Sequence, residues 1–275
     1  MLANNELMAA SAAARRARIA AALEQDQRVR FARLAGVEAE PDAAEPSRPC
    51  VAIYVDPAGD AEVAGREVAA MLAQQPDAAG LDVAVLNTME MEAAGRLVQA
   101  SALLFDRGTE ARIEFEIRAT GAYADFRESE ELVLRERAER PYGEILAIKL
   151  AQLEHEIRRL RELAGLDVAG YVSDWRAARV VGRTLEVAIS LCIGIMKHAL
   201  AHRGLGGALT YRGHFEAARD AGLLEPELAA ALMRMCGFRN VLAHEPLHLE
   251  PAVVVAALTS GVADIERFRY AAAGW

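Results

Sequence analysis

The chain has few cysteines and few aromatic residues. Its three cysteines, Cys50, Cys192 and Cys236, are odd in number among 275 residues and show no metal-ligand spacing. This excludes a disulfide framework and a cysteine-based zinc cluster, and it favours free buried thiols in the reducing cytoplasm. Hydrophobic residues make up 53% of the chain but aromatics only 5%. That composition, rich in alanine, is typical of a helix-rich protein with ample core.

Long apolar runs are also lacking. No stretch of 18 or more uncharged apolar residues occurs, so we predict no transmembrane helix and no membrane partner. The first 25 residues contain Arg15, Arg16 and Arg18, followed only by a short alanine-rich run. They lack the apolar core of a secretory signal peptide.

The net negative charge of the chain comes entirely from its first half. Residues 1–140 carry 16 Lys and Arg against 25 Asp and Glu, whereas residues 141–275 carry 15 of each. An acidic module joined to a neutral one is a poor nucleic-acid binder overall. It could cover a phosphate-binding site on the other half, although solubility alone explains the same charge.

The first half alternates between helix and strand patterns. Residues 6–34 have the spacing of one or two amphipathic helices, with Ile19, Leu23, Phe31 and Leu34 as candidate core. Strands are predicted at 50–55, 81–86 and 102–105, and helices at 60–75, 90–100 and 109–138. This order predicts a small α/β domain with a mixed sheet.

The second half has helix patterns only, and Arg140–Pro141 is the predicted domain boundary. Helices are expected at 144–164, 173–203, 211–221, 226–244 and 250–272. We therefore predict an α+β protein, with an α/β domain over 1–140 and a bundle of four or five helices over 141–275.

The helix predicted at 226–244 ends in a chemically distinctive turn. Pro246 cannot continue a helix, so the helix should end at about His244. Asn240 and His244 are four residues apart and share a face, with Arg239 at its edge. Histidine can exchange protons with ribose and leaving-group oxygens, and arginine can clamp phosphate oxygens. Alternatively, Arg239 and His244 have only a structural role, because the dipole of a helix favours cations near its C-terminal end.

This turn resembles the hallmark of the HEPN toxin family, Arg-x4-6-His at the end of a helix. The surrounding phrases Asp174-Trp175-Arg176 and Tyr211-Arg212 resemble the family as well. The resemblance implies a metal-independent endoribonuclease without a cofactor, whose two motifs meet in a homodimer. Catalytic roles would fall to Arg239, Asn240 and His244.

The first half resembles the minimal nucleotidyltransferase that serves as antitoxin to such toxins. The family's signature is Gly-Ser, ten residues, then Asp-x-Asp. Here Gly36 and Val37 are followed at that spacing by Arg48 and Cys50, with Asp82 on the family's third-carboxylate strand. Magnesium needs two or three carboxylates in such a site. We therefore predict that this degenerate site transfers no adenylyl group.

The tyrosine that the antitoxin modifies in toxins of this family is missing too. The family's toxins carry a tyrosine two residues after the histidine, which the antitoxin modifies, and here that position is Pro246. Any control would then act by contact or occlusion.

Three hypotheses remain open. The first is an RNA-cleaving HEPN domain, acting on transfer or messenger RNA and not on DNA. The second is a non-enzymatic fusion that serves as a regulatory scaffold. The third is nucleotide binding without chemistry, with Arg48 holding a phosphate. His198 and His202 have a zinc-binding spacing, but no third ligand is evident.

Overall fold

The computed structural model divides the chain into two compact units, Met1–Tyr123 and Ala124–Trp275. The structure describes residues 2–36, 49–56, 60–78, 80–244 and 249–275.

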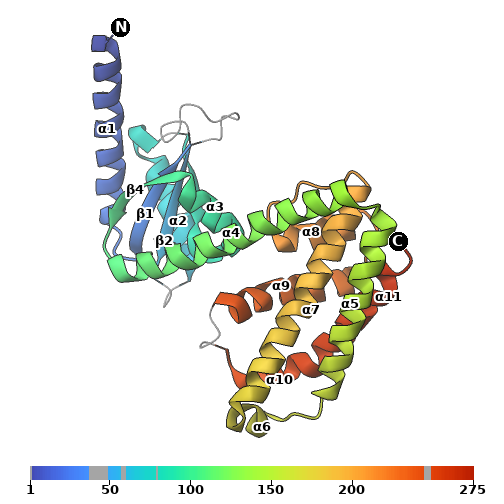
Figure 1. The fold of residues 1–275 in the computed structure, drawn as a ribbon. Coiled ribbons are helices and arrows are strands. Elements are labelled where there is room, and N and C mark those ends of the chain that lie inside the picture. Colours follow the sequence, from blue (N-terminus) through green and yellow to red (C-terminus); the bar gives the residue numbers. More distant parts are fainter. Residues whose placement is uncertain (1, 37–48, 57–59, 79, 245–248) are drawn as a thin grey trace. The chain divides into compact units, whose positions relative to one another are not determined.

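A four-stranded mixed sheet forms the centre of the first unit (Figure 1). Its strands are β1 Val29–Ala35, β2 Cys50–Val55, β3 Asp82–Val85 and β4 Ser101–Asp106. The order is β3-β2-β1-β4, in which β1 runs antiparallel to both β2 and β4 while β2 and β3 run parallel. The predicted mixed sheet is confirmed.

Helices cover both faces of this sheet. They are α1 Leu2–Glu24, α2 Ala61–Ala73, α3 Met91–Gln99 and the beginning of α4 Thr109–Glu139. Residues of α1 and α2 pack on the face that carries Ala32 and Ile53. Residues of α3 and α4 pack on the opposite face, which carries Phe31 and Ala52. Short 3-10 helices, Pro76–Ala78 and Leu86–Thr88, complete the unit.

The helix predicted to extend to residue 34 is wrong beyond α1, because β1 occupies its last part. Ile19, Leu23, Phe31 and Leu34 are all buried, as predicted. However, β1 lies between two other strands and is covered on both faces, so its apolar residues do not simply alternate. Its apolar residues are two to three positions apart, a spacing that is also compatible with an amphipathic helix, so the sequence pattern predicted a helix there.

The second unit is all helical, as predicted (Figure 1). Beyond the last part of α4, its helices are α5 Tyr142–Glu162, α6 Val168–Ser173, α7 Trp175–His202, α8 Tyr211–Asp220, α9 Pro226–His244, α10 Pro251–Ala256 and α11 Val262–Ala272. A π-helical turn, Ala257–Gly261, joins the last two. Asp174 caps α7 by accepting hydrogen bonds from the backbone of Arg176 and Ala177.

Helix α7 is the core helix of this unit. Its side chains between Val181 and Leu200 are largely buried. It is also the one helix in the described part of the chain that is long and apolar enough to cross a membrane, with 67% of its most apolar window buried. The mostly buried core helix of a bundle can have the same length and apolar composition.

The two units divide inside α4, between Tyr123 and Ala124, whereas the sequence pattern placed the boundary at Arg140–Pro141. The physical reason is that the last part of α4 is the first helix of the bundle. The rings of Phe126 and Tyr211 meet at 5.3 Å. A proline before α5 marks a turn between two packed helices, and such a turn has the same local sequence as a domain linker.

Candidate functional site

Helix α9 ends at His244, as the position of Pro246 predicted. The backbone of His244 belongs to the helix, while its side chain lies outside the described part of the structure. Arg239 and Asn240 lie in the preceding turn. Asn240 is buried, at 9% exposed, and the Arg239 side chain is also mostly enclosed, at 12% exposed.

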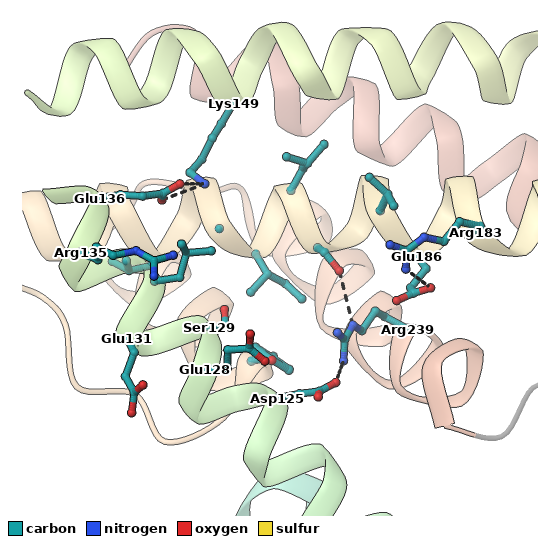
Figure 2. Close-up of a pocket in the computed structure, with 18 residues that line it drawn as sticks. Asp125, Glu128, Ser129, Glu131, Arg135, Glu136, Lys149, Arg183, Glu186 and Arg239 are labelled. Atoms are coloured by element: carbon teal, nitrogen blue, oxygen red, sulfur yellow. Dashed lines mark hydrogen bonds and ion pairs between the residues drawn. The ribbon is translucent and has the colours of Figure 1, made fainter. Parts of the chain in front are cut away.

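Arg239 is held on three sides (Figure 2). Its Nε donates to Ser190 Oγ at 3.4 Å, and its Nη1 lies 3.3 Å from Asp125 Oδ2. The centre of its guanidinium lies 5.5 Å from the Tyr211 ring centroid. These partners come from α7, α4 and α8, so three helices orient one side chain from a fourth. A guanidinium fixed in this way can present its remaining N–H donors in a defined direction.

None of these partners could be assigned from the sequence. Asp125 precedes Arg239 by 114 residues, and the sequence pattern places its helix in the first domain. Ser190 lies on the face of α7 that the apolar stripe does not use. The sequence indicates Tyr211 only through the resemblance of Tyr211-Arg212 to the HEPN family, which does not predict a contact with Arg239.

Arg239 lines a cavity of about 920 Å³. Most of its wall is formed by the last part of α4 and one face of α7 (Figure 2). Four cations and five acids line it: Arg135, Lys149, Arg183, Arg239, Asp125, Glu128, Glu131, Glu136 and Glu186. Three of the cations pair with acids of the same wall, so the cavity is not a uniformly positive funnel.

A buried lysine, Lys197, contacts Tyr211, which is one of the partners of Arg239. The side chain of Lys197 is only 2% exposed, and its Nζ lies 2.7 Å from Glu130 Oε1. It also lies 4.9 Å from the Tyr211 ring centroid, so the same ring contacts both Lys197 and Arg239. Burial alone would raise the pKa of Glu130, but hydrogen bonds from His214 and Lys197 lower it to about 2. The carboxylate is therefore ionised at neutral pH.

The histidine pair with zinc-binding spacing has other partners. His198 Nε2 lies 2.6 Å from Glu136 Oε2, which also pairs with Lys149 at 3.0 Å. Burial lowers the pKa of His198. His202 stacks on Tyr142 with ring centroids 4.1 Å apart. Within the described residues, no three His, Cys, Asp or Glu side chains gather in a way that could hold a metal ion.

The described residues of the predicted nucleotide site lie at one end of strands β1, β2 and β3. Gly36 follows β1 directly with φ of 107°, a conformation that favours glycine. Cys50, the first residue of β2, pairs with Ala35 on one side and with Asp82 on the other. Burial raises the pKa of the Cys50 thiol, and nearby Asp82 adds to that effect. Val37 and Arg48 lie outside the described residues.

One family model matches a segment of the second unit. Residues 153–272 match the family described as Ribonuclease HepT-like. No curated protein matches the chain. Among solved structures, one chain of a toxin–antitoxin structure with AMP-PNP shares 24% identity, with a TM-score of 0.46, over 48% of this chain and 99% of its own. A chain of the solved complex of the tri-AMPylated Shewanella oneidensis HEPN toxin with MNT antitoxin shares 24% identity, with a TM-score of 0.45, over 48% of this chain and 98% of its own.

The matched segment contains the whole Arg239–His244 turn and the helix that supplies Ser190. The similarity to the Ribonuclease HepT-like family is thus limited to residues 153–272, which are less than half of the chain.

Proposed function

We propose that the second unit is a metal-independent endoribonuclease. A histidine at the end of α9, His244, would take the proton from a ribose 2′-OH, whose oxygen then attacks the adjacent phosphorus. The bond from phosphorus to the 5′-oxygen breaks, and that oxygen takes up a proton. The products are a 2′,3′-cyclic phosphate and a 5′-hydroxyl. Proton transfer of this kind suits a group that titrates near neutrality.

The fixed position of Arg239 is the observation that carries this proposal. Charge accumulates on the phosphate oxygens in the transition state, and a preorganised guanidinium stabilises it without reorganising. Ser190, Asp125 and Tyr211 supply that preorganisation. Buried Asn240, next along the helix, would hold the end of α9 in register rather than touch RNA.

The site is proposed to be completed by a second copy of the chain. One arginine and one histidine provide a phosphate clamp and a single proton-transfer group, whereas the reaction needs both an acid and a base. Two helix ends related by two-fold symmetry would supply both. The proposed assembly is a cytoplasmic homodimer through the HEPN domain.

The first unit is proposed to have no adenylyl-transfer activity. Where the family holds its metal, Cys50 and Asp82 are paired at the beginnings of β2 and β3, so Asp82 is the one carboxylate among the predicted site residues that the structure describes, and a metal pair needs several. Incubation with labelled ATP should leave the chain and other acceptors unlabelled. A transferred AMP group would contradict this inference. The proposed role of the unit is control of its neighbour through contact.

Cleavage of total tRNA in the presence of EDTA tests the main proposal. The wild-type chain should cut, while Arg239→Ala and His244→Ala should lose at least about a hundredfold in rate, as expected for a lost acid–base or oxyanion group. Circular dichroism should show that both variants remain folded. Full activity of His244→Ala would refute the assignment.

A second candidate is a non-enzymatic scaffold, favoured by the ion pair of Arg239 with Asp125. A carboxylate already occupies part of the guanidinium that RNA would need. If neither the full chain nor the isolated second unit cleaves RNA under any condition that preserves its fold, the scaffold is the better description.

A further inference from the structure

Helix α7 carries an arginine stripe beside an exposed tryptophan. Arg176, Arg179 and Arg183 are spaced by three and four residues, so they share one face of the helix. All three are exposed, and Trp175 at the start of the helix is 63% exposed. The arginine stripe, defined as these three residues, thus borders a large unburied ring.

The arginine stripe leads to Arg239. Ser190 lies two helical turns beyond Arg183 on the same face, and its hydroxyl accepts the hydrogen bond from Arg239. Arg183, Ser190 and Arg239 line the same cavity (Figure 2). At 1.5 Å per residue, the distance along the helix from Arg176 to Ser190 is about 21 Å. That length accommodates a short run of nucleotides.

Most of the positive charge of the arginine stripe is not neutralised by ion pairs among the residues that the structure describes. Arg183 pairs with Glu186 at 2.9 Å, and its side chain remains 70% exposed. Arg176 and Arg179 form no ion pair with any residue that the structure describes; the Arg176 guanidinium lies instead 4.9 Å from the Trp175 ring centroid. Helical arginines whose only role is solubility commonly pair with acids three or four residues away, as several do on α4 and α5.

We infer that Trp175 and the arginine stripe bind single-stranded RNA and guide it to Arg239. This inference rests on the proposed function and names the path that its substrate takes. Arginines neutralise successive phosphates, and a base stacks on the indole. A single strand is required because bases within a duplex are already stacked and cannot reach a side-chain ring.

Tryptophan fluorescence of the full chain provides a direct test. The chain has two tryptophans, so Trp275→Phe leaves Trp175 as the only one. The probe is a short single-stranded RNA whose 2′-hydroxyls are all methylated, which prevents cleavage. Saturable quenching of Trp175 is expected, and the same sequence as a duplex should quench far less. Absence of quenching by the single strand would overturn the proposal.

Charge-matched variants test the arginine stripe, with anisotropy of the labelled probe as the readout. Arg176→Ala/Arg179→Ala should weaken binding by about tenfold or more and reduce the salt slope by about two. The control is Arg158→Ala/Arg159→Ala, which removes equal charge from an exposed face of α5. Equal effects of the two variants would show that only net charge matters and would overturn the proposal, as would unchanged binding.

The stacking role has its own control. Trp175→Phe should keep most of the affinity for the methylated RNA, while Trp175→Ala should lose about fivefold or more, since stacking contributes about 1–3 kcal/mol per base. Equal loss from both substitutions would place Trp175 at a protein contact instead.

Failure of this inference can be told apart from failure of the proposed function. If His244→Ala abolishes cleavage while the stripe variants bind RNA normally, only the binding path is wrong. If the stripe binds as expected but His244→Ala still cleaves, the catalytic assignment is wrong and the binding site stands.

Discussion

Asp125 Oδ2 lies 3.3 Å from Nη1 of Arg239, the residue proposed to hold the scissile phosphate. The carboxylate belongs to the last part of α4, and the arginine belongs to α9. The side chain of Asp125 is 37% exposed, whereas that of Arg239 is only 12% exposed. The pair therefore lies at the wall of the cavity, where the carboxylate both orients the guanidinium and competes with an incoming phosphate.

Removing this competition should strengthen RNA binding. Asp125→Asn keeps an acceptor for the guanidinium but removes the charge, and a partly exposed ion pair contributes up to about 1 kcal/mol. The affinity for methylated RNA should rise by as much as about fivefold. The control, Glu128→Gln, removes a charge from the same wall and should change affinity less. A lower affinity of Asp125→Asn would show that orientation outweighs competition.

Tyr211 should be needed as a ring rather than as a phenol. The ring contacts both Arg239 and Lys197, so Tyr211→Leu removes two cation–π contacts and leaves both cations less well placed. We expect a loss of about tenfold or more in kcat for RNA cleavage, while Tyr211→Phe retains most of the rate. Similar rates for the two variants would mean that the ring does not position the arginine.

Acid should weaken the second unit through Glu130. The pKa of this carboxylate is lowered to about 2 in the folded protein, below its ordinary value of 4.5. Its stabilising contribution is therefore complete above pH 4.5 and is lost as the pH falls from there towards 2. The free energy of unfolding, measured with urea at several pH values, should fall less steeply over this window in Glu130→Gln than in the wild type.

The control for that measurement is Glu131→Gln. Glu131 pairs with Arg127 at 3.3 Å, but both side chains are more than half exposed. Such a pair contributes little, so the pH dependence should match the wild type. Equal slopes for the wild type and Glu130→Gln would contradict the assigned role of Glu130.

A fragment cut at the sequence-predicted boundary should fold poorly. Residues 141–275 lack Ser129, Glu130 and Glu136, which are the partners of buried Lys197 and His198. Loss of the partner of a buried charge destabilises by about 3–5 kcal/mol. Residues 124–275 retain these partners and should unfold cooperatively at a higher temperature by circular dichroism. Equal melting temperatures would show that the last part of α4 is dispensable.

Much of the fold followed from local sequence. Helical periodicity located α5, α7, α8 and α9, and the apolar runs located β2, β3 and β4, because these signals depend on residues close together in the chain. Pro246 set the end of α9, since a proline excludes the residue before it from helical geometry. The HEPN resemblance rested on the same turn, and the match over residues 153–272 confirmed it.

Only the tertiary structure decided which distant residues meet. The sequence of β1 does not show the alternating pattern of a strand, because β1 lies inside the sheet and is buried on both faces. Only the tertiary structure therefore distinguishes it from a helix. Likewise, the partnership of Asp125 with Arg239 and of Glu130 with Lys197 depends on α4 packing into the bundle. By itself, the sequence determined the kinds of side chain available for RNA chemistry. Packing between helices determined which charges meet, because long-range contacts leave no period or spacing in the chain.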